Sequence, residues 1–449
     1  MNRRLLTLCP SLCLASIAAG AITSGVETRA ASPYPGQARA ARTGMTEASR
    51  ALALGSIAAR LRKTYLYPAL VPKILAKLNA SAARYATDDP VLFARMITDD
   101  MQAVSGDTHL YLNFEPGWYA ASRAAPTPGK VAADAALAIS EARDFNHGLA
   151  ETRILPGNVR YLRLDGFFWV GPESARAYDS AMRFLRDGKA IILDLRGNGG
   201  GDTAAAYYLL SYLLAPGAPI VREVSPGARD RQVRASLRLP GRRLSDLPLF
   251  VLVNGHSRSA AEAVAYTVRE FRLGAVVGER TAGAAHISDD TAIAPFFRFS
   301  VPIRRTVNPV SGTDWEGVGV APTVSTSSRG ALDTAYGLAL TALLRSTRDA
   351  EKRAFLVWAQ QGVLARLAGR PPDGAELPAL AGKYGPAEVE FRDDALWLHR
   401  PDRTDLKLVP IGPDGLFEAE EVDTLRVRIG KRSLDVLRPL AVLDEHYER

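Results

Sequence analysis

Two stretches, Ala190-Ile-Ile-Leu-Asp-Leu-Arg-Gly-Asn-Gly-Gly-Gly-Asp202 and His256-Ser-Arg-Ser-Ala-Ala-Glu262, decide how this chain folds. Each belongs to a segment in which a short apolar run ends in a polar or glycine-rich turn, followed by an alanine-rich, helix-favouring segment. Such a turn leaves unpaired backbone N–H groups at a helix N-terminus, where they can hold an oxyanion. The second turn also carries the hydroxyl of Ser259, which could act as a nucleophile. The pattern predicts a serine hydrolase.

The same alternation of apolar runs and amphipathic segments continues over residues 145–345. Strand and helix signals that alternate at this spacing predict an α/β core with mainly parallel strands. The predicted strands are 159–164, 191–195, 249–253 and 275–278, and the predicted helices are 174–185, 203–214 and 260–271.

The flanking segments have different patterns. Apolar residues recur at helical spacing over residues 46–114, which predicts a helical N-terminal domain that ends in a turn and a strand. The Ala- and Pro-rich stretch 120–140 is interpreted as a linker. A connecting helix is expected within 346–371, and the short alternating runs of 372–449 predict a separate small all-β domain resembling a barrel or sandwich.

Residues 1–31 have the composition of a secretory signal peptide: a basic start, an apolar run and small residues suited to cleavage. A single membrane anchor is the alternative, but the run is interrupted by polar residues and Pro10. Both cysteines, Cys9 and Cys13, lie inside this segment, so the exported protein would have no disulfide. We expect a periplasmic or extracellular protein with no stable membrane insertion after the signal is removed.

The formal net charge is +8, and the only dense basic run lies between Arg222 and Arg243. Nucleic-acid sites usually interleave such charges with aromatic residues that stack on bases, and this run has none. The run is therefore interpreted as a solvated β-hairpin, and no nucleic-acid partner is expected.

Ser259 and the glycine loop each allow two interpretations. Ser259 directly precedes a helix-forming run, so its hydroxyl could be a nucleophile beside the Ala260 N–H, or it could be an ordinary N-cap. The loop Gly197–Asp202 lacks the lysine of a phosphate-binding loop and the third glycine of a dinucleotide fingerprint. An oxyanion site at the N–H of Gly199 or Gly200 fits this loop better.

Six histidines could supply a base, and two of them have a local reason to be singled out. His109 lies on the turn Gly106-Asp-Thr-His, and His256 lies three residues before Ser259. The residues themselves do not decide between the two. No His-x-x-x-His or His/Cys cluster occurs at ligand spacing, so neither a metal nor a cofactor is expected.

The chain resembles the tail-specific, C-terminal-processing serine peptidases in motifs that occur in the order of that family. These motifs are Asp194–Gly201, Ser257–Glu262, Val277–Ala284 and Asn308–Pro322. The resemblance is closest to the branch related to interphotoreceptor retinoid-binding protein and the tricorn protease core. It implies a crotonase-like α/β peptidase core.

The resemblance also implies roles for individual residues. Ser259 becomes the nucleophile, with Ala260 and either Gly199 or Gly200 as oxyanion donors. Many relatives use a lysine base about 25 residues after the serine, but Ala284 stands at that offset here. A tricorn-like arrangement instead takes its histidine from the Gly-Asp-x-His turn, oriented by a glutamate; these correspond to His109 and Glu316. Thr108 keeps the hydroxyl that tricorn has before its histidine.

The resemblance further implies a peptide or protein substrate and hydrolysis of peptide bonds. A non-catalytic carrier of a hydrophobic ligand is the rival hypothesis, suggested by the retinoid-binding relative. The PDZ-type domain of many relatives is absent, because the segment 115–145 is too short for it. An oriented carboxylate partner such as Glu316 would raise the pKa of a His109 base somewhat above 6.5, so kcat/KM should fall on the acid side at about pH 6–7.5.

Overall fold

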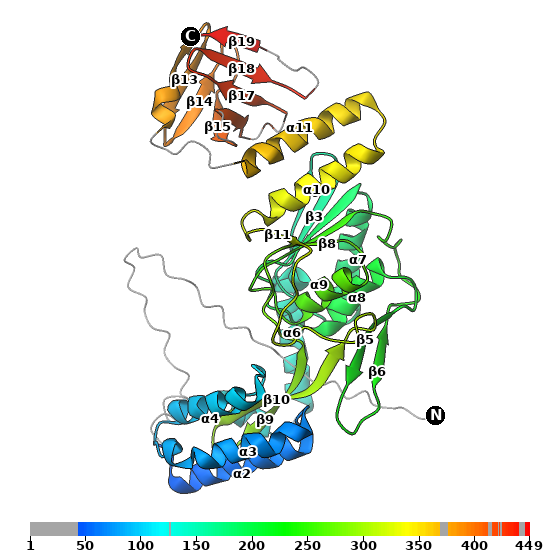
Figure 1. The fold of residues 1–449 in the computed structure, drawn as a ribbon, viewed down its shortest axis with the longest axis vertical. Coiled ribbons are helices and arrows are strands. Elements are labelled where there is room, and N and C mark those ends of the chain that lie inside the picture. Colours follow the sequence, from blue (N-terminus) through cyan, green and yellow to red (C-terminus); the bar gives the residue numbers. More distant parts are fainter. Residues whose placement is uncertain are drawn as a thin grey trace.

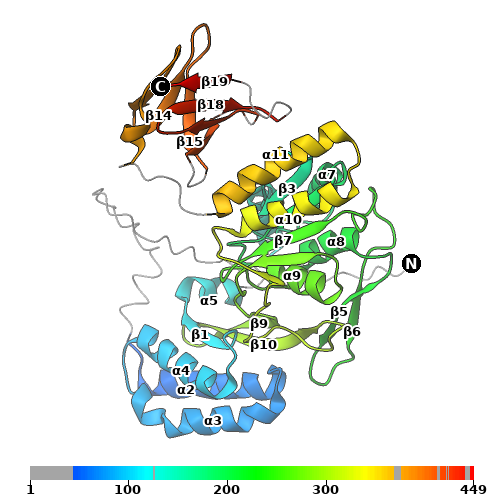
Figure 2. The ribbon, with the colours of Figure 1, turned by 45° about the horizontal axis from the view of Figure 1, so that its top comes forward.

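A computed structural model describes residues 44–124, 127–368, 376–411, 415–420, 422, 424–439 and 445–449. The predicted signal peptide, residues 1–31, lies outside these ranges. Within them, none of the helices combines the length and apolar character that crossing a membrane requires. Figures 1 and 2 show helices at the N-terminal end, a mixed α/β region in the middle and a β domain at the C-terminal end.

The middle of the molecule is a six-stranded sheet in the order β11-β8-β7-β4-β3-β2. Its strands are β2 (Leu149–Leu155), β3 (Val159–Leu164), β4 (Ala190–Asp194), β7 (Leu249–Val253), β8 (Ala275–Gly278) and β11 (Val324–Ser325). All neighbours pair in parallel except β2, which runs antiparallel to β3. The predicted α/β region with mainly parallel strands is therefore confirmed.

Helices cover both faces of this sheet. Successive side chains of a strand point to opposite faces, so those of one strand are buried on both sides. Ile191 and Leu193 pack under α7 (Pro172–Arg186), α8 (Thr203–Leu213) and α9 (Ala260–Glu270). Ile192, between them, faces α10 (Ala331–Ser346) and α11 (Ala350–Leu367). The uninterrupted apolar run of β4 follows from this double burial.

The N-terminal helices form their core together with a second sheet. The helices are α2 (Glu47–Thr64), η1 (Pro68–Leu70), α3 (Val71–Ala80), η2 (Ala82–Tyr85) and α4 (Pro90–Ser105). The sheet consists of β1 (Tyr111–Phe114), β5 (Pro219–Val224), β6 (Arg231–Arg234), β9 (His286–Ile293) and β10 (Phe297–Val307). Phe297, Phe299 and Val301 of β10 are fully buried in the same apolar cluster as the helices. Strands from late in the chain thus complete the helical part.

The prediction of a linker over residues 120–140 is wrong. Two helices occupy this region, α5 (Pro116–Arg123) and α6 (Pro128–Asp144), and η3 (Asn146–Gly148) follows. The hydroxyl of Thr127 accepts a hydrogen bond from the Lys130 N–H, and proline stands at the first helical position of α6. An N-cap, an N1 proline and the helix propensity of alanine together favour a helix over a linker.

The basic run forms the expected hairpin, in which β5 pairs antiparallel with β6. Glu223 on β5 is buried, and its carboxylate accepts hydrogen bonds from Arg231 and Arg304. Part of the positive charge is therefore neutralised within the protein.

The C-terminal part is an antiparallel, near-barrel meander in which each strand pairs with the next. After η4 (Leu377–Leu380) come β12 (Gly382–Tyr384), β13 (Ala387–Arg392), β14 (Ala395–His399), β15 (Leu406–Pro410), β16 (Leu416–Ala419), β17 (Arg426–Ile429), β18 (Ser433–Leu437) and β19 (Glu445–Glu448). Arg426 joins this part to α11: its guanidinium donates to the Trp358 carbonyl over 2.7 Å and lies 4.2 Å from that ring's centre. Glu418 accepts from both Arg426 and Arg366.

Arg426→Ala should lower the free energy of unfolding of the full chain by about 2 kcal/mol, because the substitution removes a buried guanidinium that donates to the Trp358 carbonyl and to Glu418. Arg428→Ala, on the same strand but exposed, is the matched control and should change stability by less than about 0.5 kcal/mol. Denaturant unfolding of both variants measures the difference. Equal effects would contradict a docking role for Arg426.

Candidate active site

Ser259 lies between β7 and α9, at the N-cap position of the helix. Its backbone has φ +53° and ψ −115°, whereas an ordinary N-cap residue is extended. A non-glycine residue in such a conformation is strained, and strain of this kind occurs at sharp strand-to-helix turns that present a nucleophile. The backbone thus departs from the simple capping interpretation.

Buried Glu262 holds this turn in place, although sequence reasoning did not single it out. Its Oε2 accepts hydrogen bonds from the N–H groups of Ser259, at 2.9 Å, and Ala284, at 2.8 Å. Its Oε1 accepts from the Thr281 hydroxyl and the Gly283 N–H. One carboxylate therefore ties the start of α9 to the loop after β8. The spacing of Ser259 and Glu262, typical of a capping box, was the available signal.

The glycine loop packs directly against Ser259. A Cβ added to Gly200 would lie 2.8 Å from the Ser259 Cβ and 2.9 Å from the Arg258 carbonyl oxygen. The N–H of Gly200 already donates to Asn198 Oδ1 at 2.8 Å. In the described part of the chain, no hydrogen bond engages the N–H of Gly199 or Ala260. Of the two candidate glycines, Gly199 is therefore the one with a free donor.

His109 follows the C-terminus of α4, where Gly106 adopts φ +68° and ends the helix. The Asp107 carboxylate then accepts a hydrogen bond from the His109 N–H over 3.0 Å, which closes the turn before β1. His109 Nδ1 lies 3.3 Å from Glu316 Oε1, across 207 residues of sequence. The structure therefore brings together the two residues that the resemblance assigns as base and orienting carboxylate.

Glu316 is fixed by more than this contact. Its Oε2 accepts hydrogen bonds from the N–H groups of Ala285, at 2.6 Å, and His286, at 3.0 Å. Burial raises the pKa of Glu316, but hydrogen bonding to His109 and the charges of both histidines outweigh it and lower the pKa overall. The carboxylate is therefore held in its ionised form next to His109.

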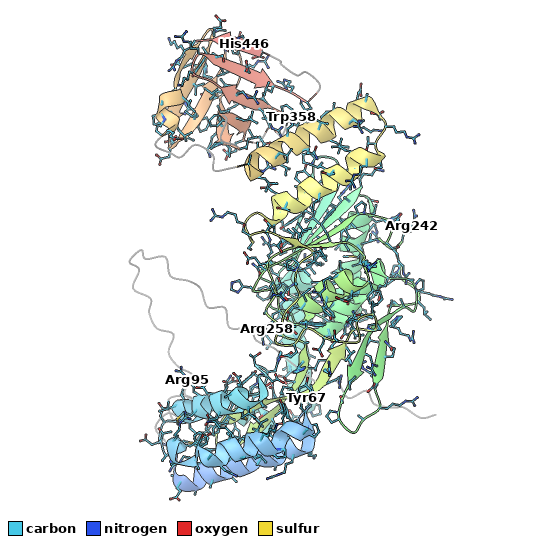
Figure 3. All side chains as sticks on the ribbon, in the orientation of Figure 1. Tyr67, Arg95, Arg242, Arg258, Trp358 and His446 are labelled. Carbon is cyan, nitrogen blue, oxygen red and sulfur yellow. The ribbon has the colours of Figure 1, made fainter. Side chains whose placement is uncertain are left out.

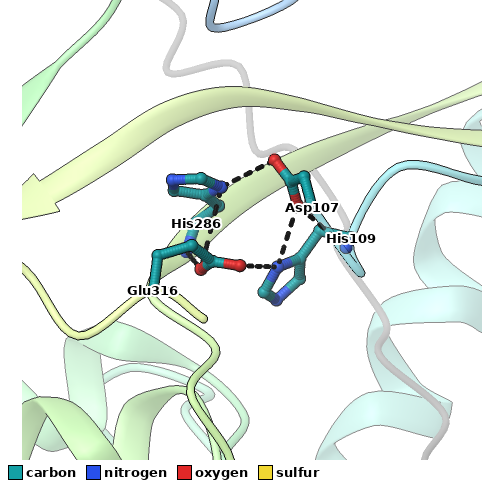
Figure 4. Close-up of side chains that lie close together, drawn as sticks. All are labelled: Asp107, His109, His286 and Glu316. Carbon is teal, nitrogen blue, oxygen red and sulfur yellow. Dashed lines mark hydrogen bonds and ion pairs between the residues drawn. The ribbon is translucent and has the colours of Figure 1, made fainter. Parts of the chain in front are cut away.

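His286 was not singled out from the sequence, yet it lies in the same group (Figure 4). Its Nδ1 lies 2.8 Å from Asp107 Oδ2, and its Nε2 lies 3.0 Å from the Tyr67 hydroxyl. Only 1% of the side chain is exposed. Because Asp107 and His286 are 179 residues apart, no local spacing could have indicated this contact.

Burial would lower the pKa of His109, but hydrogen bonds that the imidazole donates to Asp107 and Glu316 outweigh it and raise the pKa to about 9. The titration expected at about pH 6–7.5, from one carboxylate partner such as Glu316, is corrected by this value. Asp107, two residues before the histidine, adds a second carboxylate. Burial disfavours the charge on Asp107, yet both histidines stabilise it and lower its pKa.

Thr108 and His256 lie outside this group of contacts. Thr108 is exposed, and its backbone carbonyl, rather than its hydroxyl, accepts a hydrogen bond, from Gln102. His256 is exposed, and only its backbone N–H takes part in a described hydrogen bond, to Asn254. Among the described residues, neither side chain has a hydrogen bond or ion pair with His109 or Glu316.

The contacts therefore form two groups: Ser259 with the glycine loop, and His109 with Glu316. Arg258, next to Ser259, lies near enough to His109 for its charge to oppose protonation of the imidazole. Figure 3 shows Arg258 on the side of the central region that faces the N-terminal helices, and Tyr67 on the side of the helices that faces it. Both groups thus lie toward the junction of these two parts.

The structure also gathers a set of possible metal ligands that spacing along the chain does not reveal. One atom each from Asp107, His109, His286 and Glu316 lie within 4.8 Å of one another. The expectation of no metal site rested on local ligand motifs, whereas these residues come from three separate segments: the turn that carries Asp107 and His109, the start of β9 and the loop that carries Glu316.

Comparison with known proteins finds similarity to one class of enzymes. Residues 158–326 match the model of peptidase family S41. The C-terminal processing peptidase of Tetradesmus obliquus is 30% identical over 181 residues, which are 39% of this chain and 38% of that protein. The carboxy-terminal-processing protease of Bartonella bacilliformis is 26% identical over 205 residues, 44% of this chain and 45% of that protein. The chain thus spans less than half of either relative.

Among solved structures, the photosystem II D1 C-terminal processing protease is 18% identical and has a TM-score of 0.42; the match covers 63% of this chain and 94% of that one. Residues 158–326, which include the strained Ser259 at a helix start, thus resemble peptidase family S41. Both relatives are C-terminal-processing proteases, and these similarities support the resemblance to tail-specific, serine-type peptidases.

Gly200→Ala should destabilise the protein more than Gly197→Ala. Both positions have positive φ, +101° and +77°, so both substitutions introduce backbone strain of about 1–2 kcal/mol. Only the Gly200 substitution also collides with Ser259, because the space around Gly197 is open. We expect an additional loss of about 1–3 kcal/mol in denaturant unfolding. Equal losses would mean that the glycine loop does not pack tightly on Ser259.

Proposed function

We propose that this protein hydrolyses peptide bonds in peptide or protein substrates with Ser259 as the nucleophile. His109 accepts the Ser259 proton at Nε2, since its Nδ1 faces Glu316. Glu316 holds the imidazole in the required tautomer and stabilises the imidazolium. The N–H groups of Gly199 and Ala260 stabilise the oxyanion, and Thr108 is a polar neighbour of the base rather than a member of the relay.

The observation that carries the proposal is the backbone of Ser259, strained at φ +53° and packed on Gly200. This conformation turns the residue toward a surface with two free N–H donors, which an ordinary N-cap does not need. The 3.3 Å contact between His109 and Glu316 adds an oriented base. The match of residues 158–326 to peptidase family S41 agrees with this chemistry.

The finer features of the hypothesis are proposals too. We place the chain in the branch related to tricorn and to interphotoreceptor retinoid-binding protein, with a crotonase-like core, because no lysine follows Ser259 at the usual offset and a histidine–glutamate pair exists instead. Export to the periplasm or the extracellular space is proposed from the composition of residues 1–31.

The carrier hypothesis receives no comparable support. A hydrophobic ligand needs an apolar cavity, and roughly 150 Å³ is required for one as small as benzene. The apolar void between Met182, Leu193 and Leu209 has a volume of about 10 Å³. A larger hollow of about 370 Å³ lies in the C-terminal part, but the charged Glu376 and Lys431 are among its lining residues. Because Ser259, His109 and Glu316 occur together, a peptidase is the better hypothesis.

Ser259→Ala should abolish peptide hydrolysis and labelling by a fluorophosphonate, because both need the hydroxyl. Its free energy of unfolding should change by no more than about 1 kcal/mol, the contribution of a helix cap. Mass spectrometry of the labelled wild-type protein should find the adduct on Ser259. Wild-type turnover in the variant, or an adduct on a different serine, would reject Ser259 as the nucleophile.

The pH profile should report the raised pKa of His109. A general base must be neutral, and below a pKa of about 9 this histidine is mostly protonated. In buffer that contains a chelator, kcat/KM should therefore rise about tenfold per pH unit up to about pH 9 and then level off.

Glu316→Gln removes one cause of the raised pKa, so its profile should shift to lower pH while kcat falls. His256→Gln is the matched control and should keep the wild-type profile, since its side chain is exposed and outside the group. Two results would contradict His109 as the base: a wild-type kcat/KM profile that levels off already near pH 6.5, or a shifted profile in the His256 variant.

A further inference from the structure

The group of Asp107, His109, His286 and Glu316 forms a closed ring in which imidazole nitrogens alternate with carboxylates (Figure 4). His286 Nδ1 lies 2.8 Å from Asp107 and 3.7 Å from Glu316. His109 Nδ1 lies 3.6 Å from Asp107 and 3.3 Å from Glu316. Both imidazoles therefore point the same ring atom at the same two carboxylates.

One ligand atom from each of the four residues can be brought to a single tetrahedral ion. Zinc binds imidazole nitrogen and carboxylate oxygen at about 2.0–2.2 Å, so neighbouring ligand atoms of a tetrahedron are about 3.3–3.6 Å apart. In the ring each carboxylate turns one oxygen toward each imidazole, so the four separations of 2.8 to 3.7 Å use both oxygens of Asp107 and of Glu316. One ligand atom from each residue still lies within 4.8 Å of the others, and side-chain shifts that shorten the longer separations would place these four atoms around one zinc ion.

The surrounding contacts orient these groups as outer partners orient metal ligands. The Glu316 carboxylate accepts two backbone N–H groups, and Asp107 accepts the His109 N–H. The Tyr67 hydroxyl lies 3.0 Å from His286 Nε2, the ring nitrogen that faces away from the centre. Side-chain exposure is 1% for Asp107 and His286. The ligand atoms are thus preorganised and largely removed from water.

The donor set favours zinc over the hard cations. Calcium and magnesium take six or more oxygen ligands, whereas two nitrogens and two carboxylates suit a four-coordinate zinc ion. Two carboxylates also balance its charge. We propose that Asp107, His109, His286 and Glu316 form a reversible Zn²⁺ site that switches this peptidase off.

The chemistry of inhibition follows from the ring atom that the metal takes. Zinc bonded to His109 Nδ1 displaces the proton there, and the neutral imidazole then carries its remaining proton on Nε2. That nitrogen can no longer accept the proton of Ser259. Inhibition rests on the proposed function, but zinc binding does not.

Binding is tested on the Ser259→Ala variant, in which hydrolysis plays no part. Metal-free protein competes with a chromophoric chelator for Zn²⁺, and we expect one ion per chain. His286→Gln and Asp107→Asn should each weaken binding at least about tenfold. The matched control removes the exposed His399 and His446 together, as His399→Gln with His446→Gln, and should bind like the parent.

A second measurement, with Co²⁺, needs no substitution and therefore tests the site even if a variant fails to fold. Co²⁺ bound to the unaltered chain should give the intense visible bands of a four-coordinate site. The zinc site would be overturned by any of three results: no binding, the bands of a six-coordinate ion, or binding that is lost only in the control with both surface histidines replaced.

Inhibition is a separate test. If hydrolysis is detected, added Zn²⁺ should inhibit it and a chelator should restore it; zinc that binds without inhibiting would overturn the switch. An inactive protein that binds zinc at the ring would instead reject the proposed function.

Discussion

Strand β10 supplies the apolar residues that the N-terminal helices cannot provide for themselves, and the rest of the arrangement depends on this shared core. Phe297, Phe299 and Val301 are fully buried among α2, α3 and α4. The same strand pairs with β1, which begins two residues after His109, and with β9, which begins at His286. The loop after it carries Glu316. Burial of one strand thus fixes three loops that converge on a single group of side chains.

Buried carboxylates then fix the positions of these loops. Glu262 and Glu316 each accept backbone N–H groups from the loop between β8 and β9, and Asp107 accepts one from its own turn. A carboxylate that leaves water must be compensated by hydrogen bonds, and several N–H donors do this at defined geometry. The loops are therefore held by directional contacts as well as by packing, which suits a site whose atoms must stay in register.

The two carboxylates that would orient His109 also raise its pKa, and with His286 they create a ring suited to zinc. All three effects follow from one cause, the concentration of negative charge around two nearly buried imidazoles. A base of this kind would be well oriented, but near neutral pH most of it would be protonated and unable to accept a proton. Protons and zinc would then compete for the same ring atom, which would link activity to both.

The sequence by itself determined the alternation of the α/β region, the strands at 159–164, 249–253 and 275–278, and the strand-to-helix turns around Gly197–Asp202 and Ser259, because these depend on local periodicity and turn chemistry. It missed α6, since alanine-rich sequence flanked by prolines suits both a linker and a helix. It could not choose His109 over His256 without a family resemblance. Only the tertiary structure decided that Asp107 meets His286 and that His109 meets Glu316. These contacts join residues 179 and 207 positions apart, depend on how the sheets pack and leave no periodic signal in the chain.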